Sequence, residues 1–157
     1  MVHSRRSRIW VAGIALVGTA VAGGPVARAQ PTTLDDLAAA VVRIKTFIDP
    51  DGRTVQNLGR EREGSGIVID SDGLVLTIGY LMVEAHAAEV VTNDGRTVPA
   101  KVVGYDHETG FGLLHAAQPL KLRPMPLGKS SALKERDPVL IASFGGASMV
   151  APAHVAA

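Results

Sequence analysis

The five histidines of this 157-residue chain are the first candidates for chemistry, because imidazole is a common metal ligand and general base. A helical metal site would place two of them four residues apart, and no pair has that spacing. The chain has no cysteine, which excludes thiolate ligands, thiol catalysis and disulfides. We therefore predict no metal site. The histidines are His3, His86, His107, His115 and His154.

A serine hydroxyl becomes a nucleophile when a nearby imidazole accepts its proton. Ser65 lies between two glycines without a neighbouring histidine, and we interpret it as the entry to a strand. His86 follows Tyr80 by six residues on a helical or turn segment, and we interpret it as a surface histidine and not a displaced base. Tyr80 is interpreted as a packed aromatic residue, with a peptide-binding hydroxyl as the alternative.

Two Asp-Gly turns have the acidic opening of a calcium loop, but neither continues as that loop requires. An EF-hand beginning at Asp70 needs glycine at its sixth and glutamate at its twelfth position, where the chain has Val75 and Leu81. A loop beginning at Asp49 fails at the same two places. The glycine-rich stretch 144–148 matches neither a nucleophile elbow nor a phosphate loop. We expect ordinary turns and no cofactor.

Short apolar, often β-branched runs separated by tight turns make up most of the chain. Runs typical of strands lie at residues 41–47, 66–69, 74–77, 89–92, 97–105, 111–114 and 139–143. Gly73 and Gly95 follow aspartates and favour tight hairpins, whereas Pro99 indicates a sheet edge or a bulge. Thr33 and Asp36 predict a capping box for a short helix over residues 34–40. This pattern predicts an all-β fold, an antiparallel barrel or sandwich preceded by one helix.

The first 29 residues have the three-part composition of a secretory signal peptide. A basic start is followed by an almost uncharged apolar run over residues 9–22, and Ala27-Arg-Ala29 offers small residues for cleavage. The alternative is a membrane anchor, for which this run is short. Arg5 and Arg6 hint at twin-arginine export, but Arg8 interrupts that motif, so the export route stays open.

Removal of these residues would change the charge balance. Four of the sixteen Lys and Arg residues lie in the first 29, which leaves twelve basic against fifteen acidic residues and a formal net charge of −3. The basic pI of the whole chain is therefore caused by the basic residues among the first 29, and we predict no nucleic-acid partner. The remaining 128 residues are enough for one domain with its own core.

Residues 64–77 read Gly-Ser-Gly, a strand, Asp-Gly, a second strand and Thr77. This block resembles the first barrel of HtrA/DegP-type, trypsin-like serine proteases, in which it leads into the catalytic histidine. The likeness continues through residues 93–106, 109–114, 126–130 and 139–143, and covers about residues 38–146. The resemblance implies a six-stranded antiparallel barrel, the first of two.

The resemblance also implies where the catalytic residues should be. The family's histidine position is Tyr80, and its aspartate position is Gly110, within residues 109–114. The serine block belongs to the second barrel and has no counterpart before Ala157. A tyrosine hydroxyl with a pKa of about 10 is a poor base at neutral pH, and glycine has no side chain to orient one. We therefore predict no catalytic residue.

These observations lead to three hypotheses about function. The first is an inactive protease homologue, exported to the bacterial periplasm, that binds unfolded peptides or a partner protein. The second is a fragment of a serine endopeptidase whose second barrel is missing from this chain. The third is a structural protein of the cell envelope. In each case we expect a signal peptide over 1–29, the barrel over 30–146, and a tail or truncated start of a second barrel over 147–157.

Overall fold

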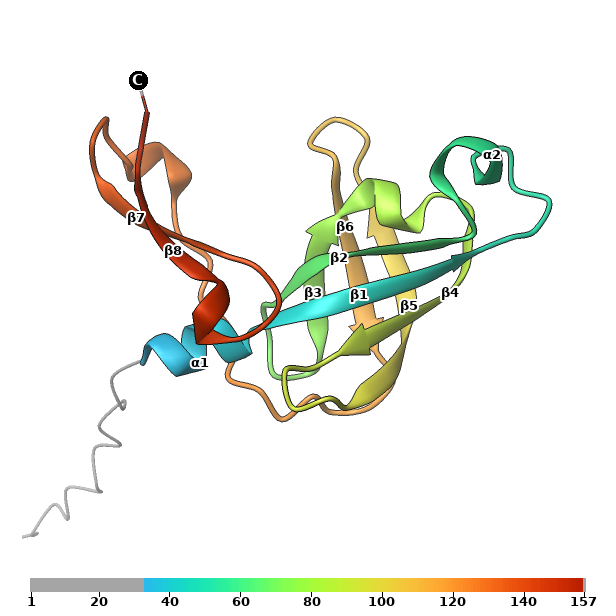
Figure 1. Cartoon of the computed structure of the whole chain (residues 1–157), viewed down its shortest axis with the longest axis horizontal. Coiled ribbons are helices and arrows are strands. Elements are labelled where there is room, and N and C mark those ends of the chain that lie inside the picture. The colour runs from blue at the N-terminus through green and yellow to red at the C-terminus, as the bar shows by residue number, and fades with distance from the viewer. Residues whose placement is uncertain (1–32, 157) are drawn as a thin grey trace, which may run out of the picture. The chain divides into compact units, whose positions relative to one another are not determined.

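The computed structural model describes residues 33–156, which belong to one compact unit (Figure 1). The predicted signal peptide and His3 lie outside the described residues. The first element is helix α1, Leu34–Ala39. The Thr33 hydroxyl accepts a hydrogen bond from the Asp36 backbone, and the Asp36 carboxylate accepts one from the Thr33 backbone. The predicted capping box is therefore confirmed.

Six strands form a closed antiparallel barrel, which confirms the predicted fold class. Their order around the barrel is β1-β2-β3-β6-β5-β4, so β1 pairs with both β2 and β4 and closes the ring. Closure leaves none of the six strands with a free edge. The strands are β1 Val41–Ile48, β2 Glu61–Val68, β3 Leu74–Ile78, β4 Ala85–Val91, β5 Thr97–Tyr105 and β6 Phe111–Ala116.

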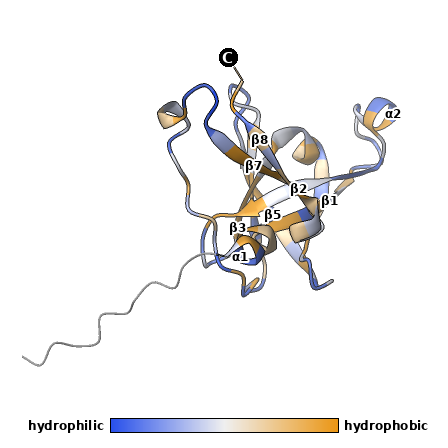
Figure 2. Cartoon of the chain, turned by 60° about the vertical axis from the view of Figure 1, so that its left-hand side comes forward, coloured by the Kyte–Doolittle hydropathy of each residue, from blue (hydrophilic) through white to orange (hydrophobic). Residues whose placement is uncertain are grey.

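The barrel interior is filled by the inward-facing aliphatic residues of these strands. Side chains alternate across a strand, so every second residue of β1 points inward, as Val42 and Ile44 do. Val75 and Leu114 pair across β3 and β6 and are both fully buried. Figure 2 shows the hydrophobic residues on the barrel strands. This core holds together a domain that has no disulfide.

The tight turns form where the Asp-Gly pairs predict them. Gly73 and Gly95 have φ of 96° and 86°, the left-handed region that glycine tolerates best. Pro99 pairs with Glu89 of β4, and the pairing of β5 with β6 begins only at Ala100, so the proline lies just beyond the end of that ladder. Strand β5 as a whole is not an edge strand, and its bulge lies elsewhere, between Val102 and Gly104. Pro99 needs no N–H bond to β6, and its carbonyl accepts from the Ala117 backbone at 2.8 Å.

Short helices connect several of the strands. Helix α2, Val55–Leu58, lies in the charged loop between β1 and β2, and the 3₁₀ turn η1, Gly79–Met82, joins β3 to β4. After β6 the chain passes over the barrel, where Leu120 is buried and the Met125 backbone donates to the Val68 carbonyl. The turn η2, Ser130–Ala132, follows. No helix within residues 33–156 is long and apolar enough to cross a membrane.

The last two strands form a separate hairpin. The run at 139–143, counted above among the barrel strands, lies in β7, Pro138–Ala142, which pairs only with β8, Val150–His154. The turn η3, Ala147–Met149, leads into β8. The hairpin loop touches the barrel through Phe144, whose backbone donates to the Ser65 hydroxyl and whose ring lies 4.5 Å from the Arg43 guanidinium.

Candidate functional site

Tyr80 and Gly110, the two residues singled out from the sequence, line the same pocket. It has a volume of about 310 Å³ and is also lined by Ile78, Tyr105, Thr109 and Phe111. Thirty residues separate Tyr80 from Gly110 in sequence, so the pocket depends on the barrel topology. This pocket is the candidate site.

The pairing of β3 with β6 brings the two halves of the pocket together. Ile78, the last residue of β3, lies opposite Phe111, the first residue of β6. Immediately beyond this pair, the Gly79 backbone donates a hydrogen bond of 2.7 Å to the Gly110 carbonyl. The turn that carries Tyr80 is thus fastened to the loop that carries Gly110.

Buried polar side chains hold the η1 turn from inside the barrel. One amino group of Arg62 donates to the carbonyls of Tyr80 and Val83, at 2.7 and 3.1 Å. The Thr46 hydroxyl donates to the Leu81 carbonyl at 2.6 Å. Both side chains come from strands β2 and β1, and both residues are buried. These bonds satisfy turn carbonyls that have no partner in a regular strand.

Sequence reasoning missed Arg62, although the sequence contains a signal for it. Its position in β2 has the same parity as Gly66 and Val68, which face inward. An arginine on the inward face of a strand must find hydrogen-bond acceptors, because burying an unpaired charge is very costly. Its Nε has no partner within the described residues, so its bonding rests on the two terminal amino groups.

The second amino group of Arg62 connects η1 to the loop between β1 and β2. It donates to the Thr54 hydroxyl at 2.6 Å, and that hydroxyl donates to the Glu84 carboxylate at 2.5 Å. Glu84 also accepts from the backbones of Thr54 and Arg53. The Thr54 hydroxyl, followed by these backbone bonds, lowers the pKa of the Glu84 carboxyl. The network fixes both ends of the turn that precedes β4.

Tyr80 itself does not pack as expected. Its side chain is 43% exposed, and the aromatic residue that packs against the turn is Tyr105. A Cβ at Gly79 would lie 2.0 Å from the Tyr105 ring, so glycine at position 79 leaves the space which that ring occupies. The exposed rings of Tyr80 and Phe111 remain at the pocket surface.

Gly110 has a left-handed backbone conformation, with φ of 73°. Apart from its two chain neighbours, no residue has an atom within 4 Å of where its Cβ would be, so a side chain there would meet open space but a strained backbone. The loop before it is closed by Asp106, whose carboxylate accepts from the Thr109 hydroxyl at 2.7 Å and the Glu108 backbone at 3.0 Å. These bonds, the Thr109 hydroxyl first, hold the pKa of Asp106 below its usual value.

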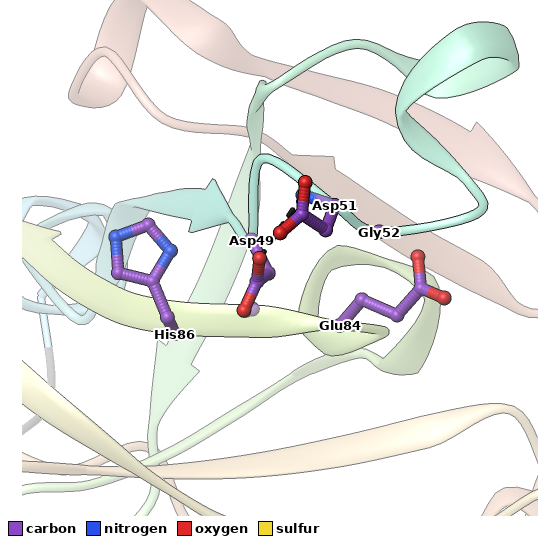
Figure 3. Close-up of a pocket in the computed structure, with 6 residues that line it drawn as sticks. Asp49, Asp51, Gly52, Glu84 and His86 are labelled. Carbon is purple, nitrogen blue, oxygen red and sulfur yellow. Dashed lines mark hydrogen bonds between the residues drawn. The ribbon is translucent and has the colours of Figure 1, made fainter.

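His86 lies away from this pocket. It is the second residue of β4, so its expected place on a helical or turn segment is wrong, although it is exposed as predicted. It lines a different pocket with Asp49, Asp51 and Glu84, which Figure 3 shows. The two pockets share no lining residue. The Glu84 carboxylate is already bonded to Thr54 and Arg53.

The two acidic segments that begin at Asp49 and Asp70 form ordinary turns, as expected. The Asp70 carboxylate accepts from the backbones of Asp72 and Leu74, and that of Asp49 accepts from Asp51. Across residues 33–156, no three His, Asp or Glu side chains gather in a way that could hold a metal ion. His107 contacts the Tyr105 ring, with a centroid separation of 4.3 Å.

The candidate site is therefore an aromatic and aliphatic pocket. Its six lining residues include two phenol hydroxyls and one threonine hydroxyl, and neither an imidazole nor a carboxylate. Such a surface can bind apolar side chains and offer hydroxyls for hydrogen bonding. Among these lining groups, none is a base suited to neutral pH.

Comparison with known proteins places the chain in one protein family. Residues 64–157 match the family described as the trypsin-like peptidase domain. The chain is 32% identical over 126 residues to the serine protease PepD of Mycobacterium tuberculosis, which covers 74% of this chain and 26% of that protein. It is 35% identical over 75 residues to the periplasmic pH-dependent serine endoprotease DegQ of Escherichia coli, which covers 47% of this chain and 16% of DegQ.

A solved structure has the same fold. The HtrA-type protease AlgW, a variant with a tripeptide, superimposes with a TM-score of 0.65 at 24% identity. The match covers 79% of this chain and 38% of that one. The chain thus spans about a quarter or less of the curated relatives described above.

Proposed function

Because the chain belongs to the trypsin-like peptidase family, as a homologue of the HtrA/DegP serine proteases, we propose that it is a member that does not cleave peptides. The observation that carries this proposal is the pairing of Tyr80 with Gly110 in one pocket. These are the positions at which the family resemblance implies the histidine base and the aspartate that orients it.

The chemistry of these two residues supports inactivity. Attack by serine requires a base that is largely unprotonated at neutral pH yet strong enough to take the proton, and an imidazole meets both conditions. A phenol does not, because its pKa is near 10. The Asp106 carboxylate, in the loop that carries Gly110, accepts hydrogen bonds from the Thr109 hydroxyl and the Glu108 backbone within that loop. His86 lines a different pocket.

A proteolysis assay tests this proposal. We expect the purified chain to leave casein intact and to remain unlabelled by a fluorophosphonate probe that reacts with activated serines. DegP of E. coli, handled in the same way, is the positive control. Cleavage by the chain that a serine-directed inhibitor blocks would overturn the proposal and favour the second hypothesis, a fragment of an active endopeptidase.

We further propose that the pocket binds extended peptide segments of unfolded proteins. The exposed rings of Tyr80 and Phe111 and the exposed side chain of Ile78 support this, because aromatic rings supply large contact area at a small cost in conformational entropy. Titration of a fluorescent apolar peptide should show saturable binding that Phe111→Ala weakens about tenfold, a loss of about 1.4 kcal/mol.

Leu127→Ala is the matched control for that titration, since Leu127 is also exposed but lies outside the pocket. Equal affinities for the two variants would show that the peptide binds elsewhere. Absence of any binding would favour the third hypothesis, a structural role in the envelope.

Export to the periplasm is the last part of the proposal. It is supported by the composition of the first 29 residues and by the periplasmic location in the names of the relatives DegP and DegQ. Intact mass of the protein recovered from a periplasmic extract should correspond to a chain that begins at Gln30. Recovery of the whole chain in the membrane fraction would instead indicate an anchor.

A further inference from the structure

The loop between β1 and β2, residues 49–60, has few attachments to the rest of the chain. It stands away from the barrel strands and carries α2, none of whose residues is buried (Figure 1). Within residues 33–156, every hydrogen bond between residues 51–59 and a residue outside this loop involves Glu84 or Arg62. The position of the loop therefore depends on two side chains.

The Glu84 carboxylate holds the loop by three hydrogen bonds. It accepts from the Arg53 and Thr54 backbones at 3.1 and 2.9 Å, and from the Thr54 hydroxyl at 2.5 Å. Hydrogen bonds to an ionised carboxylate are stronger than those between neutral groups. A Cβ at Gly52 would lie 2.8 Å from one oxygen of this carboxylate, so glycine at position 52 leaves room for the side chain to reach the loop (Figure 3).

These bonds hold Glu84 in an unusual backbone conformation. Its φ is 60°, in the left-handed region that residues other than glycine seldom adopt. It lies between the end of η1 at Met82 and the start of β4 at Ala85. Such a conformation costs free energy and persists only where the surrounding structure enforces it. Release of the carboxylate would let the backbone after η1 relax, so the chain has two states, with the loop attached or released.

Arg62 connects the loop to the turn that carries Tyr80. One of its amino groups donates to the Thr54 hydroxyl, and the other donates to the carbonyls of Tyr80 and Val83. The guanidinium is planar and rigid, and its Nε has no partner within residues 33–156. The Thr54 hydroxyl therefore fixes the orientation of the guanidinium, and with it the position of the donor that holds the Tyr80 carbonyl.

We infer that attachment of this loop by Glu84 regulates the pocket that Tyr80 lines. With the loop attached, Arg62 holds the η1 carbonyls in place, and with the loop released it loses the acceptor that orients it. Thr54, Arg62 and Glu84 do not line the pocket, so they act on it through the η1 backbone. The inference rests on the proposed peptide binding. Coupling between two sites is reciprocal, so a peptide in the pocket must also favour the attached loop.

Two variants release the loop without changing a residue of the pocket. Thr54→Val removes the hydroxyl at nearly constant size, and Gly52→Ala displaces the Glu84 carboxylate from the other side. Each should weaken binding of the fluorescent apolar peptide about fivefold. Thr54→Ser keeps the hydroxyl and should bind as the unmodified chain does. In the reverse direction, saturating peptide should slow hydrogen exchange at the Arg53 and Thr54 amides, which do not line the pocket.

Fluorine NMR tests the coupling without a peptide. The chain has two tyrosines, Tyr80 and Tyr105, so 3-fluorotyrosine gives two signals, which Tyr80→Phe assigns. Thr54→Val and Gly52→Ala should move or broaden the Tyr80 signal, and Thr54→Ser should not. An unchanged Tyr80 signal, or a peptide affinity that both releasing variants leave unchanged, would overturn the inference. If the unmodified chain binds no peptide while the Tyr80 signal still responds, the proposed peptide binding fails and the coupling of the loop to Tyr80 stands.

Discussion

The barrel and the hairpin use similar residues and reach opposite degrees of burial. Ile44 in the middle of β1 has 0% of its surface exposed, whereas Ile141 in the middle of β7 has 62% exposed. Both are isoleucines in antiparallel strands. The difference is that β1 has a strand on each side, whereas within residues 33–156 β7 has a strand on one side only. Burial here is determined by closure of the sheet more than by the sequence of a single strand.

The backbone shows the same contrast. Every barrel strand directs its N–H and carbonyl groups toward two neighbouring strands, so the backbone hydrogen bonds of the barrel are made within the barrel itself. The hairpin satisfies one side of each strand, and no strand within residues 33–156 pairs with the other side. The barrel is therefore self-sufficient in backbone hydrogen bonds, and the following changes distinguish it from the hairpin.

The largest effect is expected from a cavity in the barrel core. Leu114→Ala removes a fully buried side chain and should lower the free energy of unfolding by about 3 kcal/mol. Leu140→Ala deletes the same atoms from an exposed position and should cost less than about 0.5 kcal/mol in a monomer. Urea denaturation, monitored by far-UV circular dichroism, gives both free energies of unfolding. Equal losses would contradict the contrast drawn above.

The next largest effect concerns the turn that carries Tyr80. Arg62→Met should destabilise the barrel by about 2 kcal/mol, because the partly buried carbonyls of Tyr80 and Val83 lose their donor. Hydrogen exchange should accelerate at residues 79–84 and remain unchanged in the hairpin. Arg60→Met, at an exposed position two residues earlier, is the control and should have little effect on either region.

Much of the barrel could be predicted from local sequence signals. The capping box at Thr33 and the turns at Gly73 and Gly95 depend on neighbouring residues, so reading a few positions at a time is sufficient. The strand at 139–143 was also identified, but its partner was not. Strands inside and outside the barrel have the same apolar composition, and only the three-dimensional register separates them.

The candidate site was predicted in part. The family resemblance singled out Tyr80 and Gly110, and the structure places them in one pocket. Two features were missed because they depend on contacts between distant segments. Tyr105, from β5, takes the packed position expected for Tyr80, and Arg62 reaches the η1 carbonyls across the barrel.

Two glycines with the same backbone conformation allow a further test of the comparison, with a smaller expected effect on stability. Gly110 in the barrel and Gly146 in the hairpin loop have φ of 73° and 79°, and each would direct a Cβ into open space. Alanine at either position adds a strain of about 1 kcal/mol. Gly110→Ala should lower the midpoint of barrel unfolding, whereas Gly146→Ala should leave that midpoint in place. A shift caused by Gly146→Ala would mean that the two regions unfold together.

Acid should affect the barrel alone, with the smallest expected change. Hydrogen bonds from the Thr92 hydroxyl and then Arg96 lower the pKa of Asp94 to about 2. A carboxyl whose folded pKa is depressed contributes stability above its unfolded pKa, near 4, and loses it as the pH falls toward 2. Asp94→Asn should flatten the pH dependence of barrel stability over that interval. Residues 138–154 contain no acid, so we expect no comparable pH dependence in the hairpin.

Closure of the ring has a consequence for the order in which the chain acquires structure. Strand β6, the last of the six in sequence, lies between β3 and β5, so both of those strands keep an open side until Phe111–Ala116 arrives. During synthesis or translocation the chain emerges from its amino end, so hairpins of the first strands can form early. The barrel cannot close before about residue 116 has emerged. Until then the edges of β3 and β5 offer unpaired N–H and carbonyl groups with which another chain could pair.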